Sequence, residues 1–401
     1  MQTPSVSQAS PPKRSFLYDP NVRGIFYQTL LVVVVIYLFY MAATNAIENL
    51  RRAKIASGFG FLENTAGFDI SQTLITYSAA GSTYGEAFVV GLLNTLVVSA
   101  IGIVFATILG FLVGIARLSS NWMVRKVSMV YVELLRNIPL LLQLLFWYIA
   151  VLGPLPQPRN SVEMGAGFFL NSRGLFMPRP IYASDIWVLL TALAVGVVGS
   201  LAFRTWARRQ QAQTGRQYPV GLVTLGLVLG LPVVVWLVLA VAGANPISFD
   251  MPRKGPCNLQ GGMQILPEFV ALLIGLVTYT AAFIAEVVRA GILAVSKGQS
   301  EAAGSLGLRP GQTLRLVVIP QAMRVIVPPL TSQYLNLTKN SSLAVAIGYP
   351  DLVQVFMGTV LNQTGQAIEV VVITMGVYLT ISLLTSFVMN IYNRRVAIVE
   401  R

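Results

Sequence analysis

The sequence predicts an all-α polytopic membrane protein with about eight transmembrane helices, and three observations support this prediction. Of the 401 residues, 55% are hydrophobic and only 11% are charged, whereas soluble domains carry about a quarter charged residues. The mean hydropathy of the whole chain is +0.69. Apolar runs of about 20 residues, the length that crosses the hydrocarbon core of a bilayer, recur along the chain.

Eight apolar runs are candidate membrane-spanning helices. Pro328 and Pro329 interrupt the seventh run, which we expect to be a broken helix that packs on protein or lines a cavity. The fourth and fifth runs carry few polar groups and are joined by the basic segment 204–219, so we expect an inserted hairpin that faces lipid. The runs are 25–45, 87–116, 128–152, 184–203, 220–243, 264–288, 325–343 and 367–391.

The distribution of basic residues predicts the orientation of these helices, because Lys and Arg concentrate in cytoplasmic loops. If both termini are cytoplasmic, the cytoplasmic segments hold 18 Lys and Arg in 97 residues, and the external segments hold 9 in 121. The external loop 46–86 departs from this trend with three basic residues. The overall bias predicts that both termini lie in the cytoplasm.

The residue types that the chain lacks exclude several classes of function. It has no His, which excludes imidazole general-base catalysis, His-ligated metals and Ser-His triads. Cys257 is the single Cys, which excludes an intrachain disulfide and a thiolate cluster. No GxxxxGK[ST] phosphate-binding loop occurs, so any ATP hydrolysis must come from another chain. The net charge of +13 suits basic cytoplasmic loops better than nucleic-acid binding, because the basic residues form no stripe interleaved with aromatics.

The segment 289–324, after the sixth run, reads as two short helices joined by a turn. Ser300 can act as the N-cap of the first helix, and Glu301 suits the positive end of its dipole. Gly307 can end this helix in a left-handed conformation. We expect the second helix to end before Pro320. A helix with a small-residue face outside the membrane suits insertion into a groove of another protein.

The same segment resembles the coupling loop of ATP-binding-cassette (ABC) importer permeases. In that family Glu-Ala-Ala is followed after three residues by Gly, and after nine more by Ile-x-Leu-Pro. This chain matches the pattern with conservative changes at its two aliphatic positions only. The resemblance implies that the matching residues dock on a separate ATPase subunit. They are Glu301, Ala302, Ala303, Gly307 and Pro320.

Further stretches resemble the polar-amino-acid branch of these permeases, and the length of the chain resembles that of the larger subunits of general L-amino-acid importers. The stretches are 91–96, 133–139 with Gln143, 285–289 with 298–299, 320–322 and 339–343. The resemblance implies a type I permease core of five helices, with an N-terminal helix and an inserted hairpin added. The predicted parts are a cytoplasmic tail (1–24), an N-terminal helix with an external loop (25–86), the first part of the core (87–152), an external loop with the hairpin (153–260), the second part of the core (261–395) with its coupling loop (289–324), and a second tail (396–401).

The resemblance also implies the partners. Importers of this family combine two permease subunits with two copies of an ABC ATPase, so we expect a second, homologous permease subunit. A periplasmic amino-acid-binding protein would deliver the substrate, and the lipid bilayer of the bacterial inner membrane would surround the helices. We expect this chain to bind no cofactor, since the partner ATPase uses the ATP, and to bind no nucleic acid.

Two charged pairs are candidates for the substrate path or for bracing. Glu133 and Arg136 are three residues apart and share a helix face, where they either line a path for a zwitterionic amino acid or form a structural ion pair. The same spacing recurs at the inner end of the sixth run, where we expect bracing of the coupling loop. The residues of this group are Glu286, Arg289, Gly298 and Gln299.

Polar side chains inside the runs complete the candidates. Lys339 either attracts a substrate carboxylate or extends its ammonium group to the membrane surface. Asn94 and Gln143 either contact substrate or hydrogen-bond between helices. The full set for the substrate path is Asn94, Glu133, Arg136, Gln143, Lys339 and Asn340.

The alternative function is a stand-alone secondary transporter or channel. That function predicts an inverted repeat and charges at the bilayer midplane, and the sequence shows no such repeat, with Arg136 as its main buried charge. The sequence therefore favours a non-enzymatic permease subunit of an ABC importer. It would move L-amino acids across the inner membrane and couple to its ATPase through the loop 299–320.

Overall fold

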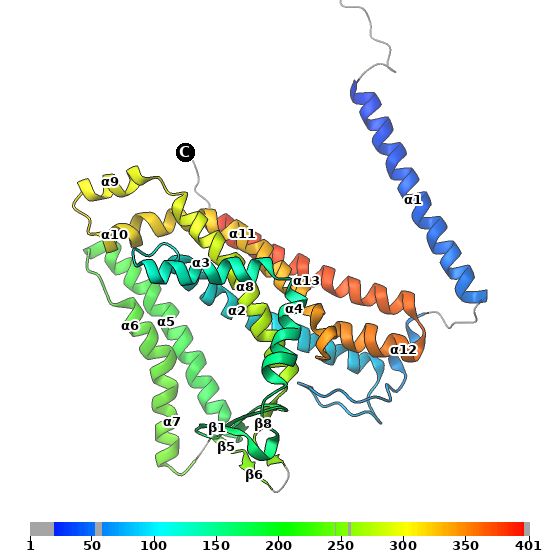
Figure 1. Cartoon of the computed structure of the whole chain (residues 1–401). Coiled ribbons are helices and arrows are strands. Elements are labelled where there is room, and N and C mark those ends of the chain that lie inside the picture. The colour runs from blue at the N-terminus through cyan, green and yellow to red at the C-terminus, as the bar shows by residue number, and fades with distance from the viewer. Residues whose placement is uncertain (1–19, 53–57, 245, 256–257, 397–401) are drawn as a thin grey trace, which may run out of the picture.

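The computed structural model describes residues 20–52, 58–244, 246–255 and 258–396 (Figure 1). Within these ranges, long helices form a bundle with small antiparallel sheets at one end. Seven helices are long and apolar enough to cross a membrane, and a bent pair brings the number to eight. The prediction of an all-α polytopic membrane protein is confirmed. Cys257 and most of the two predicted tails lie outside the described residues.

The centre of the bundle is the parallel pair α2 (Tyr84–Ala116) and α8 (Pro267–Leu293). Glycines on α2 permit their close approach. A Cβ at Gly110 would lie 2.5 Å from Cγ2 of Ile284, and a Cβ at Gly114 would lie 2.8 Å from the carbonyl oxygen of Ala285. These two helices therefore touch almost backbone to backbone.

Two further long helices cover this pair. The helix α11 (Ile319–Asn340) packs on α8 and on α13 (Ala367–Val396). Burial of apolar side chains stabilises the contact by roughly 25 cal/mol per Å². The buried residues shared by α2, α8 and α11 are Ala106, Ile284, Val288, Ala322, Ile326, Leu330 and Leu337.

The predicted third span, 128–152, is wrong as one straight helix. The chain instead forms α3 (Trp122–Asn137) and α4 (Leu140–Leu145), and α4 continues into the π-helix η3 (Phe146–Leu152). The two parts are bent by 107°. The charged residues of this run therefore lie on a separate helix, and not within a continuous span.

A proline and a glutamine explain this break. Pro139 lacks a backbone N–H and restricts the residue before it, so Ile138 is extended with φ −97° and ψ 128°. The amide of Gln143 then caps the end of α3, because its Nε2 donates to the carbonyl oxygens of Leu135 and Ile138, both at 2.9 Å. The side chain thus satisfies carbonyls that the interrupted helix leaves without donors.

The seventh span departs from its prediction in the opposite way. It is helical from Pro310 to Ile347, through α10 (Pro310–Thr313), the π-helix η6 (Leu314–Val318), α11 and the 3₁₀-helix η7 (Ser341–Ile347). Pro328 and Pro329 lie inside α11. The expected end before Pro320 is also wrong. The π-helix η6 ends at Val318, two residues before Pro320, so this proline, which lacks a backbone N–H, follows a turn that already departs from the α-helical hydrogen-bond pattern.

The inserted hairpin consists of α5 (Ile186–Thr214) and a second arm. This arm runs through α6 (Val220–Leu225), the π-helix η5 (Gly226–Gly230) and α7 (Leu231–Val241). A Cβ at Gly196 would clash with the carbonyl of Leu227, so glycine permits the contact between the arms. The helix α5 extends beyond the predicted run, so most of 204–219 is helical. The N-terminal helix α1 (Pro20–Arg52) lies apart from the other helices in Figure 1.

The sequence did not predict the sheets at one end of the bundle. The largest is antiparallel, in the order β1 (Val162–Gly165), β2 (Phe168–Asn171), β3 (Gly174–Met177) and β8 (Met263–Ile265). The strand β8 leads directly into α8. Two strand pairs accompany this sheet: β4 (Arg179–Tyr182) with β5 (Ile247–Asp250), and β6 (Arg253–Lys254) with β7 (Leu259–Gln260).

A loop between η7 and the π-helix η8 (Val353–Val360) folds back against α2. It contains Asp351, which is fully buried. Its Oδ1 accepts the amide of Gln354 (2.8 Å) and its Oδ2 accepts the hydroxyl of Tyr378 (3.3 Å). Burial raises the pKa of Asp351 to about 7, because a low-polarity environment disfavours the charged carboxylate more than these bonds favour it.

Gly114→Ala should lower the thermal stability of the purified protein. Its new Cβ would meet the Ala285 carbonyl, and such overpacking typically costs about 1–3 kcal/mol. Gly376→Ala in α13 is the matched control, because nothing lies within 4 Å of a Cβ there. The measurement is thermal unfolding in detergent. Equal unfolding midpoints for the two variants would contradict the proposed tight contact.

Asp351 should make the free energy of unfolding decrease as pH rises. Its pKa is about 7 in the folded protein and 3.8 ordinarily, so between these values the folded form binds more protons than the unfolded form. The stabilisation is present below the lower value and is lost as pH rises through the upper one. Asp351→Asn keeps an oxygen acceptor for Gln354 and should flatten the change in unfolding midpoint between pH 5 and pH 8. If the unfolding midpoint of the variant changed with pH as much as that of the unsubstituted protein, another titrating group would be responsible.

Candidate functional site

The predicted coupling residues lie on a helical hairpin at the end of the bundle away from the sheets (Figure 1). Its first helix, α9 (Lys297–Ser305), exposes Glu301 and Ala302 and buries Ala303 against the hairpin. The helix begins earlier than predicted. Ser296, and not Ser300, precedes its first residue, so Glu301 lies in the second turn. The hairpin thus presents an acidic and a small side chain together to the outside.

Gly307 ends α9 in the way that the sequence predicts. Its φ is +79°, in the left-handed region that favours glycine. The amide of Leu308 donates to the carbonyl of Ala303 (3.1 Å), which satisfies an end carbonyl of the helix. The chain then turns back into α10, and Leu306 projects from the turn with 83% of its surface exposed. The residues from Lys297 to Leu308 thus form a compact protrusion with defined backbone geometry, which we call the knob.

Of the other residues predicted in or beside the coupling loop, one makes a side-chain hydrogen bond, one is exposed and one has open space around it. Gln299 accepts a hydrogen bond from Nε2 of Gln321 (3.1 Å), which ties α9 to the start of α11. Pro320 also lies at the start of α11 and is exposed. A Cβ at Gly298 would meet nothing within 4 Å, so no packing contact requires glycine there.

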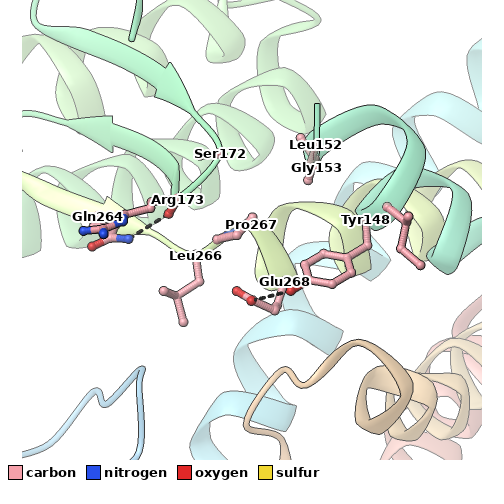
Figure 2. Close-up of a pocket in the computed structure, with 10 residues that line it drawn as sticks. Tyr148, Leu152, Gly153, Ser172, Arg173, Gln264, Leu266, Pro267 and Glu268 are labelled. Atoms are coloured by element: carbon pink, nitrogen blue, oxygen red, sulfur yellow. Dashed lines mark hydrogen bonds between the residues drawn. The ribbon is translucent and has the colours of Figure 1, made fainter. Parts of the chain in front are cut away.

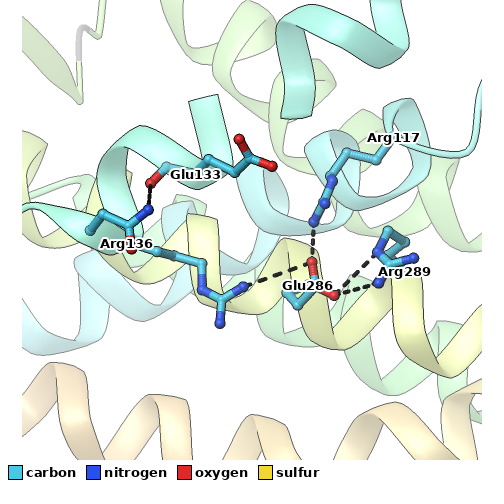
Figure 3. A network of polar contacts seen from close by, with 6 residues as sticks. Arg117, Glu133, Arg136, Glu286 and Arg289 are labelled. Atoms are coloured by element: carbon cyan, nitrogen blue, oxygen red, sulfur yellow. Dashed lines mark hydrogen bonds and ion pairs between the residues drawn. The ribbon is translucent and has the colours of Figure 1, made fainter. Parts of the chain in front are cut away.

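Glu286 is the centre of a charge network that joins three helices (Figure 3). Its Oε1 accepts Nη2 of Arg289 at 2.6 Å, one turn further along α8. Its Oε2 accepts Nη1 of Arg117, at the end of α2, and lies 3.9 Å from Nη1 of Arg136, at the end of α3. The structure therefore brings the ends of α2 and α3 to the part of α8 that precedes α9.

This network corrects the expected pairing of Glu133 with Arg136. Arg136 reaches Glu286 and also lies over the ring of Phe283, 5.2 Å from its centroid. In the described part of the chain, Glu133 makes no ion pair, and only its backbone carbonyl accepts a bond from Asn137. No local pattern pointed to Arg117, because its partner Glu286 lies 169 positions away in the chain.

Two of the predicted path residues have structural roles. Asn94 is fully buried, and its Nδ2 donates to the carbonyls of Gln72 and Pro350, both at 2.9 Å. It therefore holds two loops against α2. The Nε2 of Gln143 likewise donates to two backbone carbonyls, at the break after α3.

Lys339 does line a cavity, of ≈ 420 Å³, between α11, η8 and α13. The other polar residues of an otherwise apolar wall are Ser342, Thr374, Tyr378 and Ser382. Asn340, the next residue, is not part of this wall. Lys339 is thus a predicted path residue that faces a cavity.

Arg117→Gln should destabilise the protein more than Arg136→Gln. The side chain of Arg117 is 12% exposed and bonded to Glu286, whereas that of Arg136 is 40% exposed and 3.9 Å away. Removing one partner of a buried charged bond costs about 1–3 kcal/mol, and an exposed pair contributes about 0–1 kcal/mol. Thermal unfolding of the two variants in detergent measures the order, and an equal loss would show that the three helices are not joined chiefly through Arg117.

Comparison with known proteins gives matches over nearly the whole chain. Residues 215–398 match the family model described as "Binding-protein-dependent transport system inner membrane component". The chain is 52% identical to the general L-amino acid transport system permease protein AapQ of Rhizobium johnstonii, over 97% of this chain and 96% of AapQ. It is 51% identical to the putative amino-acid ABC transporter permease protein YhdX of Escherichia coli, over 96% of each.

A third relative also matches over nearly the full length of both chains. The glutamate/glutamine/aspartate/asparagine transport system permease protein BztB of Rhodobacter capsulatus is 40% identical, over 98% of this chain and 99% of BztB. The similarity therefore includes the inserted hairpin and the N-terminal helix as well as the core. Identity at this level over nearly the full length shows that the chain belongs to the family of ABC transporter permease subunits, the inner-membrane components of binding-protein-dependent transport systems.

Proposed function

We propose that this permease subunit imports L-amino acids across the bacterial inner membrane, driven by ATP that a separate ATPase hydrolyses. The names of the relatives support this substrate class, since each refers to amino acids. The observation that carries the proposal is the knob on α9, with Glu301 and Ala302 exposed and the helix ended at Gly307.

The position of α9 explains how it would transmit movement. The helix α9 follows α8 through a short connection and precedes the continuous stretch from α10 to α11. Both neighbours pack in the centre of the bundle, so a displacement of α9 acts on two core helices at once. Nucleotide would drive this displacement by binding more tightly to one arrangement of the ATPases than to the other. No residue of this chain takes part in covalent chemistry in this mechanism.

The bracing network belongs to this mechanism. Glu286 lies on α8 two turns before its end and bonds to Arg117 and Arg289. We propose that it keeps α2, α3 and α8 together as one unit when α9 moves. Gln299, through its bond to Gln321, would couple α9 to α11 in the same way.

We expect the importer to contain a second, homologous permease subunit, two ATPases and a periplasmic binding protein. The face of α13 beside the Lys339 cavity supports a permease partner, because it exposes Met375, Leu379 and Leu383 next to a cavity that contains a Lys side chain. In this arrangement both termini are cytoplasmic and α9 faces the cytoplasm. Lys339 would then attract the substrate carboxylate within the path between the two permeases.

Glu301→Arg should abolish ATP-dependent amino-acid uptake while the protein still inserts and assembles. A basic side chain on the knob would repel a basic partner surface, and like charges across an interface cost several kcal/mol, or a loss of at least about tenfold. The measurement is uptake of labelled L-glutamine by proteoliposomes with ATPase and binding protein supplied. Glu163→Arg, on an exposed strand at the opposite end, is the matched control. Normal uptake by Glu301→Arg would contradict coupling through this loop.

A further inference from the structure

A cavity of ≈ 470 Å³ lies at the opposite end of α8 from α9, between the core and the sheet of the insertion (Figure 2). One wall consists of η3 and the first turn of α8, and the other of the turn between β2 and β3 and of β8. Nothing in the coupling mechanism uses this cavity. Its polar lining comes from both walls: Tyr148, Ser172, Arg173, Gln264 and Glu268.

The core wall carries a carboxylate with a fixed orientation. Glu268 lies in the first turn of α8, directly after Pro267. The hydroxyl of Tyr148 donates to its Oε1 at 2.9 Å. Within the described ranges, no cation lies within ion-pair distance of Glu268 and no bond reaches its Oε2. One oxygen of a half-buried carboxylate is therefore left for a ligand.

The wall from the insertion carries a guanidinium on a rigid turn. Buried Asn171 accepts the amide of Arg173 (2.8 Å), and Nε2 of Gln264 donates to the carbonyl of Arg173 (2.7 Å). Gly174 follows with a φ of +114°, and a Cβ there would clash with the carbonyl of Ile265. The backbone of Arg173 is thus fixed, whereas its side chain is exposed and makes no ion pair with the residues described.

Figure 2 places Arg173 and Glu268 on different sides of the cavity. Opposite charges that share a cavity without pairing match a ligand that carries both charges. A free amino acid has an ammonium and a carboxylate on one carbon, whereas a lipid acyl chain or an internal peptide segment has neither. The volume lies within the range of about 300–1,000 Å³ that is typical of small-molecule sites.

We propose that this cavity binds a free amino acid before translocation, with its α-ammonium on Glu268 and its α-carboxylate on Arg173. The inference rests on the proposed function and adds a site to it. Both contacts are charge-assisted hydrogen bonds, the stronger kind in proteins. Gln264 and Ser172 supply neutral groups for the rest of the ligand. The insertion thereby has a role in transport, because it provides one of the two charges.

The test is equilibrium binding of radiolabelled L-glutamine to the complete transporter in nanodiscs, without binding protein. Arg173→Gln and Glu268→Gln should each weaken binding by about tenfold, since each removes one charge-assisted bond. The matched controls are Arg253→Gln and Glu163→Gln, which remove the same charges from exposed strands outside the cavity. They should bind like the unsubstituted protein.

Competition on the unsubstituted transporter tests the same idea without any variant. Glutaramate lacks the α-ammonium and 4-aminobutanamide lacks the α-carboxylate, so each should compete at least about tenfold more weakly than L-glutamine. Unchanged affinity in both cavity variants, in a transporter that imports L-glutamine, would overturn this site alone. A complete transporter that imports no amino acid would overturn the proposed function itself.

Discussion

The close parallel contact of α2 with α8 is the constraint on which the rest of the molecule depends. Gly110 and Gly114 bring the two helices together at the end where Arg117 bonds to Glu286. A larger residue at either glycine would move α2 away from α8, and that carboxylate would lose its least exposed partner. The same helix, α8, connects β8 at one end to α9 at the other. The position of α8 therefore governs both the cavity beside the sheet and the knob on the coupling hairpin.

Interruptions of helices carry much of the polar chemistry in this apolar chain. At the break after α3, Pro139 removes a donor and Gln143 replaces it, which places Arg136 beside Glu286. At the loop before η8, a buried Asp351 is held by Gln354 and Tyr378 beside the Lys339 cavity. Backbone carbonyls and amides freed at a break must find partners where water is scarce. Polar side chains are therefore concentrated at these points.

Sequence reasoning predicted the helices well because hydropathy depends only on local composition. It also predicted the turn at Gly307, which needs a left-handed residue. It failed where direction or distance mattered. A hydropathy window cannot detect that Ile138 and Pro139 redirect an apolar run by 107°, nor that Arg117 meets a residue 169 positions away. The π-turn before Pro320 and the short strands of the insertion depend on tertiary packing that no local pattern records.

The pairing of β4 with β5 has a consequence for the history of the chain. Tyr182 lies opposite Ile247, so the two ends of the hairpin formed by α5, α6 and α7 are neighbouring strands, about 5 Å apart. The hairpin therefore leaves and rejoins the rest of the chain at almost the same point. Such a module can be gained or lost as a unit during evolution without displacing the helices on either side, in the same way that whole domains are inserted at surface turns.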